Sequence, residues 1–364
     1  MIHLPFRIFS ATESAPKSIP TEAAFSPIGQ TPQNQRRNQR INWALGLLTI
    51  GWAGLLIGCN GTSSTVSTLG DWVKRSDLEG VARYQASGFV VNNIAYMGTG
   101  TNVSNERLQD FWAYDPARNA WTQKADFAGG ARYAAVGFSV GSKGYIGTGI
   151  DVNSNRLKDF WEYDPATNAW KKVADFTGTA RQAATSFTIG NKGYVTCGFD
   201  GNYLKDMYSY DPATNAWTKV ASYGGAKRIG AVSFVIDNKA YVGTGNNNGI
   251  PQKDWYVYDP AQDLWTQKAD FITDQAAIAR SYAVAFAING FGYITCGDTG
   301  TKDVWQYNPA ADTWATLGVF EGSSRSYGIG FAINNKGYVT TGGAGTQRYD
   351  DIWSFDPTIE QVQE

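Results

Sequence analysis

Apolar and polar positions alternate along most of this chain in short stretches, with no long helical period. Residues 132–140 are small, apolar and β-branched, and residues 141–144 are Gly-Ser-Lys-Gly, a turn signal. A second short apolar stretch follows at 145–149. Two such stretches around a glycine-containing turn predict a tight β-hairpin.

The next residues predict two more strands. A polar loop at 150–158 leads into the aromatic stretch 160–163, and the turn Asp-Pro-Ala-Thr-Asn occupies 164–168. In such a turn the aspartate accepts from backbone N–H groups, proline presets φ, and asparagine tolerates the left-handed conformation. Trp170 and the residues after it would form the fourth strand.

This third strand, turn and closing tryptophan recur along the chain at a nearly constant spacing. The copies span 110–121, 159–170, 206–217, 254–265 and 303–314, and a sixth at 351–357 stops before its tryptophan. The closing tryptophans are 47–49 residues apart. Four strands in a unit of this length predict one blade of a β-propeller, which must stack on others to bury its faces.

The copies also predict how the ring closes. Strands one to three occur six times, but the fourth strands are shifted, because Trp72 precedes the first copy and the last copy lacks its own. We expect residues 71–75 to complete the sheet of residues 325–357, which removes an open strand edge. The expected fold is therefore all-β, a six-bladed propeller of four-stranded blades closed by an N-terminal outer strand.

The repeated motifs resemble the kelch repeat over about residues 71–357. The resemblance is carried by the arginine that opens each first strand, the Lys-Gly-Tyr-Val-Thr type of second strand, Asp-x-Trp-x-Tyr-Asp-Pro, and Asn-x-Trp. It departs at the glycine pair that often ends the second strand, which is intact only at 342–343. The resemblance implies a propeller of the galactose oxidase and kelch type.

The N-terminal part differs in composition. Residues 1–35 are rich in Ser, Pro, Gln and Thr, and either are disordered or precede the true start. Basic residues at 36–40 and an apolar run at 41–58 are typical of a secretory signal. The run ends in Leu-Leu-Ile-Gly-Cys59, which resembles the bacterial lipobox and implies cleavage before Cys59 and its lipidation. The alternative is an uncleaved membrane anchor. The apolar run has about 18 residues, which is barely long enough to span a bilayer.

These features give the expected organisation. Residues 1–58 are the extension and signal, 59–70 a flexible tether, 71–357 the propeller and 358–364 a C-terminal tail. We expect a monomeric ring in the bacterial cell envelope, held to the membrane through Cys59 and facing the periplasm or the exterior.

The composition argues against nucleic-acid binding and against histidine-based catalysis. With 31 basic and 32 acidic residues, the chain lacks the basic footprint of a nucleic-acid partner. Its one histidine, His3, lies in the segment expected to be removed, so copper oxidase activity and histidine-based catalytic arrangements are not expected. We predict no metal site, cofactor or catalytic residue. Cys197 and Cys296 share the repeat position that is threonine elsewhere, which favours small buried residues over a disulfide.

Two sets of residues are candidates for ligand contact on one face of the ring. The arginines that open the first strands should lie near the central axis, and each shares its repeat with an aspartate. They are Arg83, Arg132, Arg181, Arg228, Arg280 and Arg325. They form structural ion pairs, contact a ligand, or do both.

The second set lies in the loops between strands two and three, which vary in sequence as specificity loops do. They span 101–109, 150–158, 199–205, 246–253, 298–302 and 344–350, with Tyr203 as a candidate contact and Tyr349 nearby. An insertion within 272–279 contains a further candidate contact, Asp274. It is either neutral or a break in the symmetry of the ring of the kind that a specific site requires.

Three functions remain open. The first is a membrane-tethered binding module for a glycan or a protein partner. The second is a metal-independent carbohydrate-active enzyme similar to the kelch-fold sialic-acid epimerases, for which Glu106 and Asp274 are the loop acids to check. The third is a structural subunit of an envelope assembly.

Overall fold

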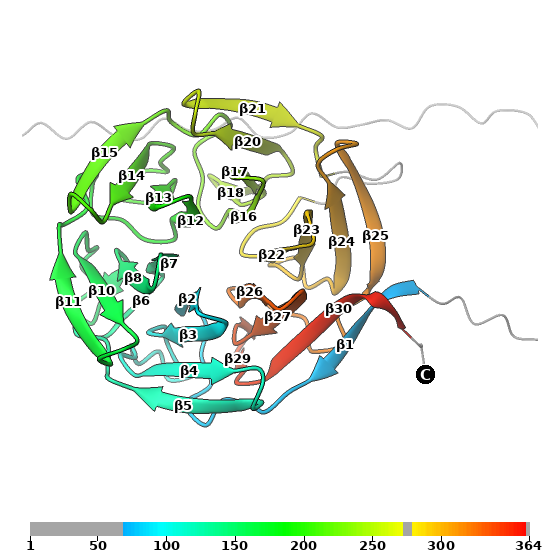
Figure 1. Ribbon diagram of the computed structural model, residues 1–364, viewed down its shortest axis with the longest axis horizontal. Coiled ribbons are helices and arrows are strands. Elements are labelled where there is room, and N and C mark those ends of the chain that lie inside the picture. Colours follow the sequence, from blue (N-terminus) through cyan, green and yellow to red (C-terminus); the bar gives the residue numbers. More distant parts are fainter. Residues whose placement is uncertain (1–67, 272–278, 362–364) are drawn as a thin grey trace, which may run out of the picture. The chain divides into compact units, whose positions relative to one another are not determined.

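The computed structural model describes residues 68–271 and 279–361, and this part of the chain is built from β-strands. Six four-stranded antiparallel sheets surround a central axis, as Figure 1 shows. The six-bladed propeller expected from the repeats is confirmed. Within the described ranges, no helix is long and apolar enough to cross a membrane.

The strands follow the repeats in order. Blade 1 contains β2 (Ser87–Val91), β3 (Ile94–Gly98), β4 (Phe111–Asp115) and β5 (Ala120–Lys124). Blade 2 contains β7 (Val136–Val140), β8 (Lys143–Gly147), β10 (Phe160–Asp164) and β11 (Ala169–Val173). Blade 3 contains β12 (Thr185–Ile189), β13 (Lys192–Thr196), β14 (Met207–Asp211) and β15 (Ala216–Val220). Blade 4 contains β16 (Val232–Ile236), β17 (Lys239–Gly243), β20 (Trp255–Asp259) and β21 (Leu264–Lys268).

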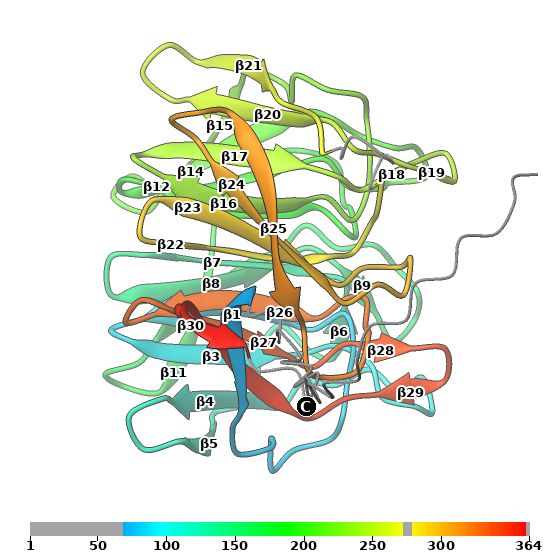
Figure 2. The same ribbon diagram turned by 90° about the vertical axis from the view of Figure 1, so that its right-hand side faces the viewer.

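The last two blades complete the ring. Blade 5 contains β22 (Val284–Ile288), β23 (Phe291–Thr295), β24 (Asp303–Asn308) and β25 (Thr313–Val319). Blade 6 contains β26 (Ile329–Ile333), β27 (Lys336–Thr340), β30 (Ile352–Gln361) and β1 (Thr68–Lys74). Short pairs extend the loops on one side of the disc: β6 (Arg132–Tyr133) with β9 (Ile150–Asp151), β18 (Asn246–Asn247) with β19 (Ile250–Pro251), and β28 (Gly343–Ala344) with β29 (Gln347–Arg348) (Figure 2).

The ring is closed by the first strand, as expected. In blade 6 the strand order is β1-β30-β27-β26, so β1 forms the outer edge. Trp72 lies opposite Phe355, and Lys74 lies opposite Trp353. The pairing is longer than the repeats indicate, because Thr68 pairs with Gln361. Residues 68–70 of the expected tether and 358–361 of the expected tail therefore belong to this sheet.

Neighbouring blades pack through their aromatic faces. The Phe111 ring of blade 1 meets the rings of Tyr163 and Trp170 in blade 2, each at 4.9 Å between centroids and edge-on. Gly144 shows how close the blades come, because a Cβ there would lie 1.9 Å from the Phe89 ring. Large flat side chains facing a glycine thus allow thin sheets to stack as wedges.

The Asn-x-Trp motifs join one blade to the next. Asn168 has a left-handed φ of 51°, as expected for the turn. Its Oδ1 accepts hydrogen bonds from the Tyr163 hydroxyl at 2.7 Å and from the Ala125 N–H of blade 1 at 3.0 Å. The Trp170 Nε1–H donates to the Ala125 carbonyl at 3.1 Å. One turn therefore satisfies both backbone groups of a residue in the preceding blade.

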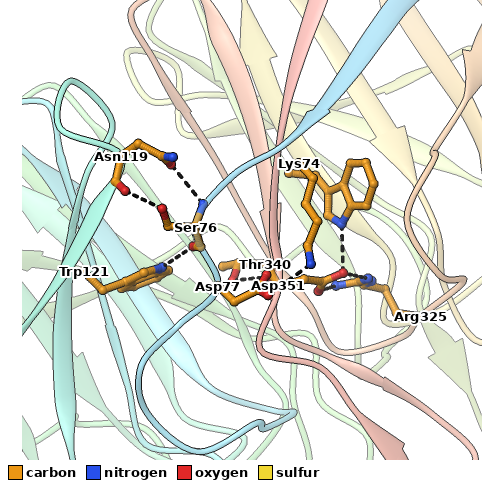
Figure 3. Close-up of polar contacts among 9 residues, drawn as sticks. Lys74, Ser76, Asp77, Asn119, Trp121, Arg325, Thr340 and Asp351 are labelled. Carbon is orange, nitrogen blue, oxygen red and sulfur yellow. Dashed lines mark hydrogen bonds and ion pairs between the residues drawn. The ribbon is translucent and has the colours of Figure 1, made fainter.

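The same joint connects blade 6 to blade 1. There the Ser76 N–H donates to Asn119 Oδ1 at 3.0 Å, and Trp121 Nε1–H donates to the Ser76 carbonyl at 3.0 Å (Figure 3). The chain following β1 is thus held by blade 1 as well as by its own sheet.

The joint between blades 5 and 6 is built differently. Trp72 has the place of the closing tryptophan, but its Nε1 has no hydrogen-bond partner. The side-chain amide of Gln361, which is 2% exposed, makes the contacts instead. Gln361 Oε1 accepts from the Val319 N–H, and its Nε2 donates to the Val319 carbonyl, both at 2.9 Å. Nε2 also donates to Glu321 Oε1 at 2.7 Å.

Gln361→Ala should therefore weaken the whole ring. It leaves both backbone groups of Val319 without partners, so we expect the free energy of unfolding to fall by about 2 kcal/mol, at about 1 kcal/mol for each lost hydrogen bond. The measurement is urea unfolding, with exposed Glu360→Ala as the control, which should change stability by less than about 0.5 kcal/mol. Equal stabilities for the two variants would show that Gln361 does not hold this joint.

Candidate ligand-binding face

The arginines that open the first strands are buried, and Arg132 shows a full set of partners. Its side chain is 1% exposed. Its N–H groups donate to both carboxylate oxygens of Asp159, at 2.7 and 2.8 Å, and to the carbonyls of Thr148, Gly129 and Gly130. These contacts use all five donors of the guanidinium group.

The ion pair is repeated in every blade, so the predicted pairing is confirmed. The shortest N···O distances lie between 2.5 and 2.7 Å, for Arg83–Asp110, Arg132–Asp159, Arg181–Asp206, Arg228–Asp254, Arg280–Asp303 and Arg325–Asp351. The Asp-x-Trp word supplies a further donor, since Trp161 Nε1–H donates to Asp159 Oδ2 at 2.8 Å. Figure 3 shows the corresponding contacts of Asp351 with Arg325, and Asp351 also accepts from Trp353 Nε1–H at 2.8 Å. Such a pair stabilises the disc, and contact of these arginines with a ligand stays a prediction.

The ion pair changes how the aspartate titrates. Burial by itself would raise the pKa of Asp159, but hydrogen bonds from Arg132, its positive charge and the Trp161 donor outweigh burial. The pKa of Asp159 is therefore lowered, and those of Asp110, Asp303 and Asp351 are lowered for the same reasons.

The two described cysteines belong to the same framework. Cys197 and Cys296 are buried and free, as expected from their repeat position. The Cys197 carbonyl accepts from Arg181 at 3.0 Å, as the Thr148 carbonyl accepts from Arg132. Burial raises the pKa of the Cys197 thiol to about 11, so it is protonated at neutral pH.

A closed ring of backbone hydrogen bonds surrounds the central channel. One residue per blade donates its N–H to the carbonyl of the equivalent residue in the preceding blade, at 2.8–3.3 Å. These residues are Gln85, Ala134, Ala183, Gly230, Tyr282 and Tyr327, and all have φ between 50° and 61°. A bulky residue rarely adopts this conformation, and strained positions of this kind cluster at functional sites.

Tyrosines occupy this position only in blades 5 and 6. The rings of Tyr282 and Tyr327 stack with centroids 3.9 Å apart, and Tyr84 meets Tyr327 edge-on at 5.6 Å. Gly230 leaves room for the Tyr282 ring, because a Cβ there would lie 2.4 Å from it. Burial and the neighbouring Tyr327 phenol raise the pKa of Tyr282. The tyrosines make one side of the channel mouth unlike the other.

A second group of arginines lies in the hairpins around this mouth. Arg107, Arg156 and Arg348 come from the loops of blades 1, 2 and 6, and each stacks on an aromatic ring of the next blade. Sequence reasoning missed them because they are absent from the other three blades. The position three residues before the ion-pair aspartate carries Arg, Arg, Tyr, Pro, Gly and Arg in blades 1 to 6. This variation is a visible departure from the repeat.

The other predicted loop residues lie in separate places. Tyr203 packs edge-on against Phe199 at 5.4 Å, and Arg325 lies over the Tyr349 ring at 4.4 Å. Glu106 is exposed, and its carboxylate accepts from Asn102 Nδ2 at 2.7 Å. Asp274 and Cys59 lie outside the described residues. Among the residues described, no group of three His, Cys, Asp or Glu side chains is placed to hold a metal ion.

Comparison with known proteins agrees with this architecture. The KLHDC2/KLHL20/DRC7 Kelch-repeats domain matches residues 74–228 and, in a second overlapping match, 179–326. The chain belongs to the kelch-repeat family. Among solved structures, the kelch propeller resembles the one titled "Structure of YjhT", with a TM-score of 0.66 and 19% identity over 76% of this chain and 95% of that chain. At this identity the likeness shows the fold. No curated protein matches the chain.

The lowered aspartate pKa values predict acid sensitivity. Because these pKa values lie below the ordinary value of about 3.9, the ion pairs contribute fully above that pH. Their contribution is lost as pH falls through the lower folded-state values. Asp159→Asn should cost about 3–5 kcal/mol at pH 7, since Arg132 stays buried without its partner, and this difference from the unaltered protein should shrink below about pH 4.

The measurement is urea unfolding between pH 7 and pH 3. Asp126→Asn is the control, because Asp126 is exposed and forms no ion pair among the described residues. A difference between Asp159→Asn and the unaltered protein that stays constant over this pH range would contradict the electrostatic origin of the effect.

Proposed function

We propose that this protein is a membrane-tethered binding module whose glycan or protein ligand lies over the channel mouth on the hairpin side. The kelch propeller is a rigid scaffold suited to binding, and its strands repeat with little change. The observation that carries the proposal is the break in symmetry at Tyr282 and Tyr327, where bulky side chains take a backbone conformation that costs energy.

The size of the channel favours a ligand that lies across its mouth. At the level of the tyrosines, the cavity is about 140 Å³, lined mainly by alanine, glycine and the two tyrosines. Ligand pockets commonly measure about 300–1,000 Å³. A ligand would therefore use the hairpins around the mouth for much of its contact.

The chemistry of the mouth supports binding over catalysis. Phenol groups and the amides of the hairpins can hydrogen-bond sugar hydroxyls or a peptide. Glu106, one of the two acids singled out for the enzyme alternative, is exposed and engaged with Asn102. The enzyme alternative is weakened to the extent that it depends on Glu106.

Replacement of Tyr327 should separate binding from folding. We expect Tyr327→Gly to be more stable than Tyr327→Ala by about 1–2 kcal/mol, because an alanine at a left-handed φ has a cost that glycine avoids. Both variants should lose the ligand. Binding is measured with the full-length chain in detergent against immobilised glycans and cell-envelope proteins, and stability by urea unfolding.

Ala183→Gly is the matched control for this experiment. It has the same place in the backbone ring, with φ of 50°, but contributes no aromatic ring. It should gain stability and keep the ligand. Capture of the same ligand by Tyr327→Gly and by the unaltered protein, with equal affinity, would rule out the channel mouth as the binding site.

The tether is a separate part of the proposal and rests on the lipobox-like residues 55–59. In bacterial cells supplied with a labelled fatty acid, the unaltered chain should become labelled and fractionate with membranes. Cys59→Ala should remove the label and leave the chain unprocessed. Labelling that persists in Cys59→Ala would place the lipid elsewhere, and membrane association without any label would favour the uncleaved anchor.

A further inference from the structure

We propose that Arg107, Arg156 and Arg348 form an arc that binds the carboxylates of an acidic polysaccharide. The inference rests on the proposed function, because it identifies the chemical class of the ligand at the same face. We call these three residues the arginine arc.

The arc differs from the buried ion-pair arginines in its unused donors. None of its members lies within 4 Å of a carboxylate oxygen among the described residues, whereas each strand-opening arginine binds an aspartate. Their protein hydrogen bonds come from Nη1 alone: Arg107 donates to Asn105, Arg156 to Asp200, and Arg348 to Gly345 and Gln347, always to backbone carbonyls.

The free donors divide into two kinds. The Nε atoms of all three arginines are buried without a partner, while their Nη2 groups make no protein hydrogen bond and are not among the buried unpartnered atoms. A ligand cannot reach the buried Nε, but each guanidinium group presents its Nη2 donors for a charge-assisted contact with a carboxylate.

Stacking holds the arc in place before a ligand arrives. Arg348 lies 3.7 Å over the Tyr84 ring, Arg107 5.1 Å over Tyr133, and Arg156 4.9 Å over Phe199. Each contact crosses from one blade to the next, and the three blades 6, 1 and 2 are consecutive in the ring. A planar group fixed against an aromatic face loses less conformational freedom on binding. Three fixed cations on adjacent blades suit an extended ligand with repeated negative charges.

Two acids in the hairpins of blades 1 and 2 are engaged within their own loops. Asp151 accepts from the N–H groups of Asn153 and Asn155, and Glu106 accepts from Asn102. The hairpins of blades 1 and 2 also contain asparagines, and that of blade 6 contains Gln347. Amides beside cations match a ligand that carries hydroxyls as well as carboxylates, which describes a polymer of uronic acids.

The test compares three oligomers of equal length as probes: an oligouronate, a neutral oligosaccharide and an oligoglutamate. Binding to the full-length chain in detergent is measured by calorimetry at low and high salt. We expect the oligouronate to bind most tightly and to weaken as salt rises. Arg107→Gln, Arg156→Gln and Arg348→Gln should each weaken it about tenfold, the effect of losing a contact worth about 1.4 kcal/mol.

Lys205→Gln is the control, because Lys205 is an exposed cation in the loop of blade 3 and should leave the affinity unchanged. Urea unfolding of each variant separates a folding defect from a binding defect, and the retained amide of glutamine limits the loss of packing.

Several results would overturn the arc. Equal, arginine-dependent binding of oligoglutamate would assign it to acidic peptides. Oligouronate binding that the arginine variants leave unchanged, or no oligouronate binding at all, would remove its role. A neutral oligosaccharide that binds independently of the arginines but is lost in Tyr327→Gly would leave the proposed function standing while the arc fails.

Discussion

Ring closure is the constraint on which the rest of the structure depends. A four-stranded blade is too thin to bury both of its faces, so each blade is stable only between two neighbours. The first and last strands of the described residues lie in the same sheet, where β1 pairs with β30 along its whole length. A single antiparallel pairing between residues nearly 300 positions apart thereby gives every blade two neighbours.

The scaffold and the binding face use the same residue type in opposite ways. A buried arginine without a carboxylate partner is strongly unfavourable, and Arg132 and its equivalents each pair with an aspartate. Arg107 and its two companions are half-buried and stacked, which keeps part of each guanidinium group hydrated. Repetition in every blade therefore marks the paired arginines as structural, and restriction to three blades marks the others as candidates for recognition.

The sequence predicted those parts of the fold that repeat. Blade number, the strand-to-strand order, the ion pairs and the closure by Trp72 all follow from counting copies. The role of Asn168 across the blade joint was not predictable. Its partner is the backbone N–H of Ala125, and a backbone contact does not depend on the residue type at position 125. Gln361 was missed for a related reason. It makes the contacts that the Asn-x-Trp motif makes at the other joints, and because it occurs once, no other copy of the repeat points to it.

The candidate site was harder to predict because function appears where the repeat fails. Tyr282 and Tyr327 stand at a position where the other blades have Gln, Ala or Gly, and nothing in the sequence indicates that its backbone is left-handed. Three of the other four equivalent sites carry alanine or glycine, so the two bulky residues call for an explanation beyond folding. Packing supplies part of it, because Gly230 in the neighbouring blade leaves room for the Tyr282 ring, on which Tyr327 stacks. Blades 4 and 5 are thus adapted to each other, and under the proposed function this local break in symmetry would let one sector of a nearly symmetric disc recognise an asymmetric ligand.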